Sequence, residues 1–177
     1  SYDLSSLSLL VSGGAVLNVG IKDEILDKIP DVMIFDGIGS SETGSQAANM
    51  SSKGMGTSTG SFLPQPGNCV LAADLSAVLE PGSEDMGWFA KAGRVPLGYL
   101  GDQAKTERTF PLLGDVRYSV PGDRARHLAS GLIEVLGRDS VTINSGGEKI
   151  FAEEVEQALK HHPAVYDVVV CGRPSRR

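Results

Sequence analysis

The chain has 177 residues and a formal net charge of −6, a size that suits one ordinary domain or one domain with part of another. A hydrophobic content of 41% with 21% charged residues is that of a globular protein rather than a disordered or membrane protein. No apolar run approaches the roughly 20 residues that span a bilayer, and the start lacks the basic region of a secretory signal. Without an internal basic cluster, nucleic acid is not expected as a partner.

Cysteine and histidine usage does not favour a metal centre. Cys69 and Cys171 are far apart and fit no metal-binding spacing, so we expect two buried thiols in a reducing, cytoplasmic environment. Three histidines, two of them adjacent, do not favour a zinc site.

The first third of the chain predicts an α/β unit. Leu7–Val11 is a short apolar run that ends at a glycine turn, and residues 19–29 carry apolar side chains at helical spacing before Pro30. Val32–Phe35 predicts a second buried strand, which runs into a polar glycine loop, DGIGSSETGS. Ligands of such units usually lie at the carboxyl ends of the strands.

The middle of the chain predicts a small β-rich subdomain. Residues 51–67 are rich in Gly, Ser, Thr and Pro, so we expect a loop or a boundary there. Thr106–Phe110 predicts a brief helix. Turn signals separate four short strand candidates, which are Cys69–Ala73, Ala77–Leu79, Gly87–Ala90 and Leu132–Leu136.

The last forty or so residues predict a strand, a turn, a helix and a strand. Val141–Asn144 is β-prone and the Gly146-Gly147 turn follows it. A helix over 152–161 is expected, with acidic residues in its first turns where they favour the helix dipole. Its expected buried stripe is Val155, Ala158 and Leu159, and Val165–Cys171 is the last strand candidate.

Four short motifs carry chemistry, although each alone also fits an ordinary surface turn. Ser41-Glu42 in a glycine loop suits a nucleotide phosphate and its magnesium ion. Asp123 behind Gly122 can accept hydrogen bonds from both hydroxyls of a ribose. Arg138 after Gly137 can bind ribose or phosphate oxygens, and the SGGE turn at 145–148 leaves room for a slender ligand along the backbone.

The order and spacing of these motifs resemble the adenylate-forming superfamily of acyl-CoA synthetases, adenylation domains and luciferases. SGGA at 12–15, GSSETG at 39–44, PGDRA at 121–125 and GRDSVTINSGGEKIFAEEVE at 137–156 occur in the order of successive family signatures. The match covers essentially the whole chain, and its last motif is most similar to bacterial fatty-acid or steroid-side-chain acyl-CoA synthetases. The resemblance implies the C-terminal part of the large nucleotide-binding domain over 1–138, with an α/β part (1–60) and a β-rich subdomain (61–138). Residues 139–177 would then be the start of the small α+β C-terminal domain.

The resemblance also implies site residues and cofactors: ATP or AMP, Mg²⁺ and coenzyme A. Ser41 matches the hydroxyl near the α-phosphate, and Glu42 the magnesium-binding acid; these two would be catalytic. Asp123 matches the acceptor for the ribose hydroxyls, and Arg138 the arginine beside the ribose. The remaining implied contacts are Gly13, Gly14, Ala15, Ile38 and Gly39 for the nucleotide, and Gly146, Gly147 and Glu148 for the pantetheine arm of CoA.

Three departures from the family pattern stand out. Ile38 occupies the place of an aromatic residue that stacks on adenine, and Pro121 that of a threonine with a hydroxyl donor. Ser140 occupies the hinge position, which is often Asp or Lys. The family's phosphate loop and the lysine that serves adenylation have no counterpart in this sequence, so we expect the 177 residues by themselves to be inactive and, through exposed apolar surface, to self-associate.

The implied activity is the two-step ligation of a carboxylic acid, a fatty or steroid side-chain acid, to CoA through an acyl-adenylate. Two alternatives remain open on the residues. One is a ligase that loads the acyl group onto a carrier protein, and the other is a module that only binds nucleotide.

Overall fold

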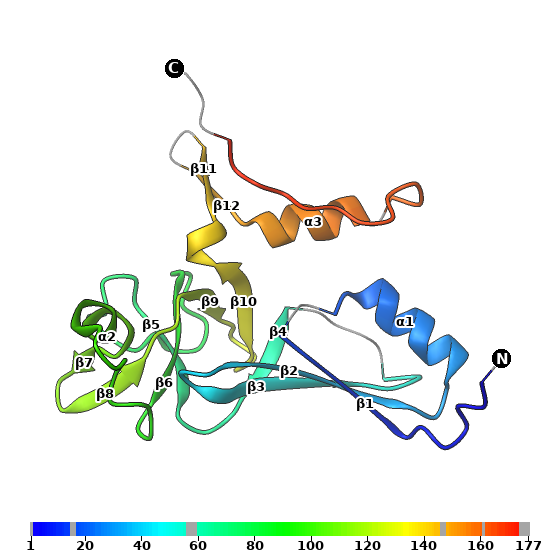
Figure 1. Ribbon diagram of the computed structural model, residues 1–177, viewed down its shortest axis with the longest axis horizontal. Helices are drawn as coiled ribbons and strands as arrows, with labels where there is room; N and C mark the ends of the chain where they lie inside the picture. The colour runs from blue at the N-terminus through cyan, green and yellow to red at the C-terminus, as the bar shows by residue number, and fades with distance from the viewer. Residues whose placement is uncertain (1, 15–16, 56–59, 146–147, 161, 174–177) are drawn as a thin grey trace.

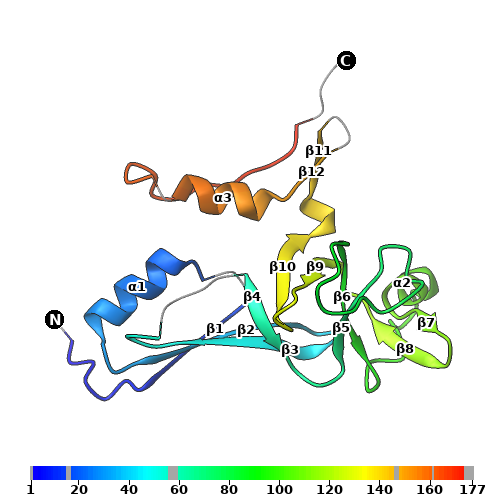
Figure 2. The ribbon, with the colours of Figure 1, turned by 180° about the vertical axis from the view of Figure 1, so that it is seen from behind.

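The computed structural model describes residues 2–14, 17–55, 60–145, 148–160 and 162–173 (Figure 1). Its strands and helices form a mixed α/β structure dominated by one long, bent sheet, which confirms the predicted fold class. Figures 1 and 2 show helices α1 and α3 on the same side of that sheet.

The predicted α/β unit is present at the start of the chain. Strands β1 (Leu9–Gly13) and β2 (Met33–Ser40) pair in parallel, and helix α1 (Val19–Lys28) connects them. The Asn18 side chain caps α1 by accepting a hydrogen bond from the backbone N–H of Ile21 at 2.8 Å. Of the expected apolar stripe, Leu26 is buried while Ile21 is exposed, and the second fully buried position of the helix is a lysine, Lys22.

The segment predicted as a glycine loop is mostly a hairpin. Strand β2 continues to Ser40, only residues 41–43 turn, and β3 (Gly44–Ser51) pairs back antiparallel. Gly39 makes this possible, because a Cβ there would collide with the carbonyl oxygen of Gly44. The prediction failed because glycine and serine normally signal a loop, whereas here they allow two backbones to approach closely.

The stretch expected to be a boundary contains a strand that joins the two halves of the sheet. Strand β4 (Ser61–Pro64) pairs with β3 on one side and with β10 (Ile133–Arg138) on the other. Among the described residues the strands therefore follow the order β1-β2-β3-β4-β10-β9-β6-β8-β7, with β5 also paired to β6.

The β-rich part contains more strands than the sequence predicts. Strands β5 (Asn68–Leu71), β6 (Gly87–Ala92) and β10 correspond to expected strands, and Val78 forms only an isolated bridge with Leu71. Helix α2 (Gln103–Thr109) corresponds to the expected brief helix. The unpredicted strands are β7 (Leu112–Leu113), β8 (Val116–Ser119) and β9 (Asp123–His127). One hydrophobic core lies where strands β5, β6, β9 and β10 meet β3 and β4. It consists of Ala47, Phe62, Val70, Phe89, Ala125 and Ile133.

The last described residues differ most from the predictions. A 3₁₀ turn (Asp139–Val141) precedes β11 (Ile143–Ser145), which forms a two-stranded hairpin with β12 (Glu148–Ile150). Residues 165–171 are not a strand, because no other strand among the described residues pairs with them.

Helix α3 (Ala152–Lys160) lies where the sequence predicted a helix, but the side chains expected to form its buried stripe are not buried. Leu159 is 44% exposed and Ala158 is exposed, whereas Phe151 and Ala152 at the start of the helix are buried. Only the beginning of α3 approaches the sheet, at β10 (Figures 1 and 2). In the described parts of the chain, no helix is long and apolar enough to cross a membrane.

Candidate functional site

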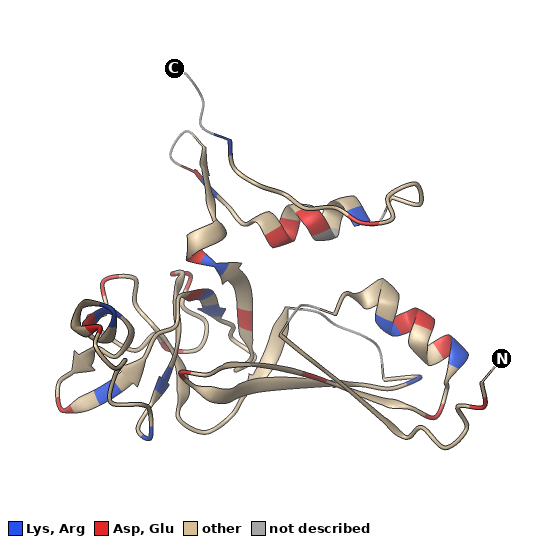
Figure 3. Ribbon diagram, viewed as in Figure 1, with Lys and Arg blue, Asp and Glu red and all other residues tan. Residues whose placement is uncertain are grey.

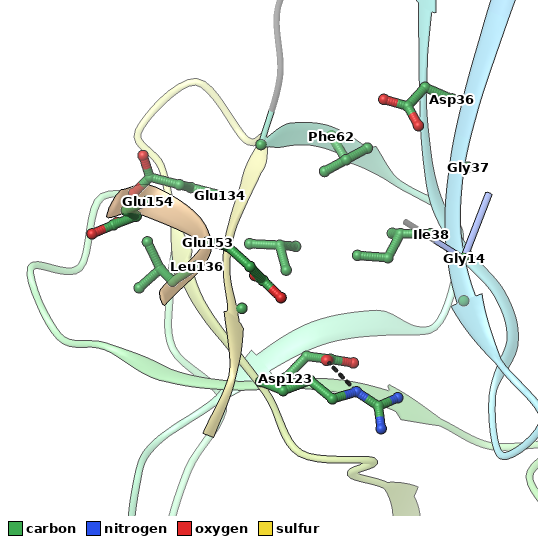
Figure 4. A pocket seen from close by; sticks show the side chains of 15 residues that line it. Gly14, Asp36, Gly37, Ile38, Phe62, Asp123, Glu134, Leu136, Glu153 and Glu154 are labelled. Atoms are coloured by element: carbon green, nitrogen blue, oxygen red, sulfur yellow. Dashed lines mark ion pairs between the residues drawn. The ribbon is translucent and has the colours of Figure 1, made fainter. Parts of the chain in front are cut away.

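A cavity of about 440 Å³ lies between the first α/β unit and the β9–β10 pair (Figure 4). One wall is formed by β2 and by Gly14 at the end of β1, and the opposite wall by β10 and the start of α3. Five residues that the sequence predicts as nucleotide contacts line this one cavity, although they are spread over more than 120 positions. They are Gly14, Ile38, Gly39, Asp123 and Arg138.

Asp123 and Arg138 lie opposite each other in the β9–β10 register. Nε of Arg138 is 3.3 Å from Oδ1 of Asp123, and the Asp123 side chain is 14% exposed against 54% for Arg138. Burial raises the pKa of Asp123 above its ordinary value, and the nearby Arg138 guanidinium only partly counteracts this. The pair therefore presents to the cavity a carboxylate that Arg138 contacts, an acceptor suited to hydroxyl donors.

The β2 wall combines bare backbone with apolar side chains. Gly37 pairs with Gly13 across β1 and β2, and a Cβ on Gly13 would lie 3.4 Å from the carbonyl oxygen of Gly37. Ile38 projects from the same strand toward the cavity, and Phe62 of β4 lies beside it (Figure 4). This wall suits a flat, largely apolar ring system that contacts backbone on its edge.

Two acidic residues of α3 also line the cavity, although the sequence predicted only that they favour the helix dipole. Glu153 and Glu154 come from the first turn of the helix, where Figure 3 shows acidic residues above the sheet. Burial raises the pKa of Glu153, and the negative charge of Asp123 raises it further. Gly137 allows this approach, because a Cβ there would collide with Oε2 of Glu153.

A buried ion pair that the sequence motifs did not predict lies behind the β2 wall. Nζ of Lys22 lies 2.9 Å from Oδ2 of Asp36, with the two side chains 0% and 4% exposed. Asp36 lines the cavity, whereas Lys22 approaches from α1. The signal in the sequence was an aspartate inside an apolar strand and a lysine at a core position of an amphipathic helix, both of which are rarely buried unless paired.

Ser41 and Glu42 lie in the β2–β3 turn rather than in the cavity wall. The Tyr99 hydroxyl donates a 2.6 Å hydrogen bond to Oε1 of Glu42, and this bond is the main reason why the pKa of Glu42 is lowered. Ser41 is exposed. The negative charge of Glu42 contributes to the raised pKa of Asp123, so the turn and the cavity share one electrostatic environment. Tyr99 lies outside the four sequence motifs, which therefore predicted no role for it.

The residues present fit one carboxylate ligand for a magnesium ion, not a protein-built metal cage. Within the described residues no group of three or more His, Cys, Asp or Glu side chains could hold a metal. Mg²⁺ in nucleotide sites commonly keeps several waters and takes one or two carboxylates together with substrate phosphates. Glu42 provides one such carboxylate in the β2–β3 turn, where one of its oxygens accepts a hydrogen bond from Tyr99.

The remaining predicted contacts are not brought into the cavity or cannot be placed. Glu148 is exposed on the β11–β12 hairpin and does not line the cavity. Gly13 pairs next to the β2 wall without lining the cavity. Ala15, Gly146 and Gly147 lie outside the described residues.

Ion pairs around Asp139 stabilise the connection between the large sheet and the β11–β12 hairpin. Its carboxylate accepts hydrogen bonds from Arg124 at 2.8 Å and from Lys149 at 3.2 Å. The guanidinium of Arg124 in turn stacks 3.6 Å above the ring centre of Trp88. Ser140, the expected hinge residue, is exposed within this 3₁₀ turn.

Relatives in sequence cover nearly the whole chain. The chain is 58% identical over 175 residues to the medium-chain acyl-CoA ligase Mig of Mycobacterium avium. It is 46% identical over 176 residues to a 3-oxocholest-4-en-26-oate–CoA ligase of Rhodococcus rhodochrous. Each match covers 99% of this chain and 32% of the relative, so the chain spans about a third of the length of the curated relatives it matches. No model of a known protein family matches it.

Solved structures with the same fold also match nearly the whole chain. The anthranilate CoA ligase AuaEII in complex with anthranoyl-AMP has a TM-score of 0.79 at 29% identity, over 98% of this chain and 32% of that one. The O-succinylbenzoate coenzyme A synthetase of Bacillus subtilis in complex with AMP has a TM-score of 0.77 at 26% identity, over 97% of this chain and 34% of that one.

The fold is therefore that of the adenylate-forming enzymes, as the sequence motifs predicted. Within that class, the chain is similar in sequence to acyl-CoA ligases and corresponds to about one third of their length.

Proposed function

We propose that the cavity binds the adenosine part of ATP in a protein that joins a carboxylic acid to CoA through an acyl-adenylate. The observation that carries this proposal is the convergence of Gly14, Ile38, Asp123 and Arg138 on one cavity, in the chain order that the family resemblance implies. The relatives are acyl-CoA ligases by name, and the two solved structures hold AMP or an acyl-AMP.

The base lies against the β2 wall in this proposal. Its face contacts Ile38, which replaces aromatic stacking with an aliphatic contact, and its edge meets the backbone at Gly14 and Gly39. The ribose hydroxyls donate to the Asp123 carboxylate, and Arg138 holds that carboxylate in place through the 3.3 Å contact.

The phosphates then extend toward the β2–β3 turn. Ser41 provides a hydroxyl donor for the α-phosphate, and its exposure leaves that hydroxyl open to a ligand. Glu42 is held by Tyr99 and provides an ionised carboxylate, which fits one ligand of a magnesium ion. Magnesium would supply charge neutralisation on the phosphate oxygens during displacement at the α-phosphorus.

The reaction has two displacements. A carboxylate oxygen of the acid attacks the α-phosphorus of ATP, which forms the acyl-adenylate and releases pyrophosphate. The CoA thiol then attacks the acyl carbon, forming the thioester and releasing AMP. No side chain of this site has to act as a nucleophile, because both steps depend on positioning and charge stabilisation. The turn at 146–148 is proposed to lie along the pantetheine arm in the second step.

The acid is proposed to be a fatty or steroid side-chain acid, since one relative is named for a medium-chain acyl group and another for 3-oxocholest-4-en-26-oate. Residues 1–138 are proposed to be part of the nucleotide-binding domain, and 139–177 the start of a smaller domain that is tied to it through Asp139.

The test uses the full-length protein with ATP, Mg²⁺ and a panel of fatty and steroid acids, with and without CoA, and analyses products by mass spectrometry. We expect acyl-CoA together with AMP for at least one acid. An acyl-adenylate that persists in the presence of CoA would instead support the carrier-loading alternative. Nucleotide binding without product from any acid would support the module that only binds nucleotide.

A further inference from the structure

Lys91 reaches from strand β6 to the turn that carries Ser41 and Glu42. Its Nζ donates a hydrogen bond to the backbone carbonyl oxygen of Thr43 at 2.7 Å and a longer one to that of Ser45 at 3.5 Å. Figures 1 and 2 show β6 beside the end of the β2–β3 hairpin, although Lys91 comes 48 positions after Thr43 in the chain. The lysine therefore joins the β-rich part of the chain to this turn.

The contacts of the Lys91 ammonium are with the backbone of the hairpin rather than with a carboxylate. No ion pair among the described residues involves Lys91. Its cross-strand neighbours are Asn68 on β5 and Ser119 on β8. Oδ1 of Asn68 and Oγ of Ser119 are buried and have no hydrogen-bond partner in the part of the chain that the structure describes. Bonds to backbone carbonyls therefore hold this half-buried cation in place.

The turn sets its own shape, but contacts from outside fix its position. The backbone N–H of Ser40 donates to Oγ1 of Thr43 at 3.1 Å, and that of Glu42 donates to Oγ of Ser40 at 3.2 Å. These bonds close the turn without joining it to other strands. Tyr99 holds the side chain of Glu42 from outside, and Lys91 holds the backbone on the carboxyl side of the same residue.

We propose that Lys91 is a positioning residue for adenylation, which fixes the turn backbone so that the Glu42 carboxylate lies where the phosphates of ATP and their magnesium ion bind. The inference rests on the proposed function, because it needs ATP bound with its phosphates at the β2–β3 turn. Lys91 does not line the cavity, and it acts through the carbonyl groups that follow Glu42.

A small displacement of such a carboxylate is costly in rate. Displacement at the α-phosphorus depends on charges that are in place before the reaction, and a misplacement of about 1 Å can lower the rate by about 100-fold. Without the ammonium, the carbonyl group of Thr43 loses its long-range donor, and the turn can move away from the position in which Tyr99 reaches Glu42. The effect of Lys91 should therefore disappear once residue 42 carries no charge.

The experiment uses the full-length protein and measures pyrophosphate release from ATP with Mg²⁺ and the acid panel described above, with decanoate as the first acid. The variants are Lys91→Met, Glu42→Gln and the double variant Lys91→Met/Glu42→Gln. Lys91→Gln replaces Lys91→Met in this cycle if the methionine variant does not fold, because a polar side chain suits the half-buried position. Calorimetry with ATP and Mg²⁺, and separately with adenosine, gives a readout that does not depend on turnover.

Gln65→Met is the matched control. Nε2 of Gln65 donates a 2.8 Å hydrogen bond to the hydroxyl oxygen of Ser45, so this variant removes a bond to the same hairpin that does not involve the turn backbone. The control should keep kcat within about twofold of the wild-type value.

For Lys91→Met we expect kcat of adenylation to fall roughly 10- to 100-fold and the affinity for ATP with Mg²⁺ to fall roughly 10-fold. Adenosine affinity should stay within about twofold of the wild-type value. In the Glu42→Gln background the same substitution should lower kcat by less than about threefold, since two residues that act as a unit are not additive.

A Lys91→Met protein with the kcat of the wild type would overturn the inference. An undiminished loss in the Glu42→Gln background would also overturn it, because Lys91 would then act independently of Glu42. Equal losses of affinity for ATP and for adenosine would indicate a general structural role and would count against it as well. A wild-type protein that releases no pyrophosphate with any acid of the panel would refute the proposed function itself, so the two failures can be told apart.

Discussion

Replacing Asp123 by alanine tests the proposed ribose contact most sharply. In the proposal this carboxylate accepts hydrogen bonds from both ribose hydroxyls, and hydrogen bonds to a charged group contribute about 1.5–3 kcal/mol each. Because Arg138 also pairs with this carboxylate at 3.3 Å, we use the lower end of that range for each hydrogen bond. The sum is about 3 kcal/mol, which predicts roughly 100-fold weaker binding of AMP.

The stability of the protein should change little in this variant. Arg138 is 54% exposed, so it remains solvated when its partner is removed. The raised pKa of Asp123 also indicates that burying its charge is unfavourable in the folded protein. We expect the free energy of unfolding to change by less than about 1 kcal/mol.

The assay pairs the variant with a ligand that lacks the same bonds. Calorimetry with AMP and with 2′,3′-dideoxy-AMP forms a cycle in which only the hydroxyl–carboxylate contact is shared. The wild-type protein should prefer AMP roughly 100-fold, and Asp123→Ala should bind both ligands equally. An Asp123→Ala protein that still prefers AMP would refute the reasoning, since another group would then hold the ribose. Asp74→Ala, which changes an exposed turn carboxylate, is the control and should leave both affinities unchanged.

Three further outcomes are expected. Burial raises the pKa of Asp123, and only its ionised form accepts hydrogen bonds from both ribose hydroxyls. The affinity for adenosine should therefore fall on acidification, beginning at a pH above the usual pKa range of aspartic acids. An affinity that stays constant down to that pH range would contradict this. Gly39→Ala should lower the free energy of unfolding by about 1–3 kcal/mol through a backbone collision, whereas Gly20→Ala in α1 should raise it by up to about 1 kcal/mol, both measured by denaturant titration. Tyr99→Phe removes the bond to Glu42 and should weaken binding of ATP with Mg²⁺, measured by calorimetry, while adenosine affinity stays at the wild-type value.

The parts of the fold that the sequence predicted are those set by local patterns. Strand β1, helix α1 and the start of β2 follow from apolar spacing and from Pro30, which ends the helical pattern. Strands β8 and β9 were missed because their pairing with β6 is non-local, and polar residues such as Arg124 and Arg126 mask their pattern. The exposed stripe of α3 shows the same limit, since periodicity does not say what covers a helix.

The candidate site divides in a similar way. Motif order predicted that distant residues such as Ile38, Asp123 and Arg138 would meet, and the structure brings them to one cavity. Their roles toward a nucleotide stay predictions. Lys22 and Asp36 were missed because a buried ion pair joins two elements whose separate patterns read as an ordinary helix and strand. Only the packing of α1 on β2 makes the pair visible.

The central claim is that this cavity holds the adenosine part of a nucleotide, and a crystal structure of the full-length protein with AMP tests it most directly. We predict the base against Ile38 and the ribose hydroxyls within hydrogen-bond distance of the Asp123 carboxylate. AMP bound elsewhere, or a cavity that stays empty at a saturating AMP concentration, would contradict the account.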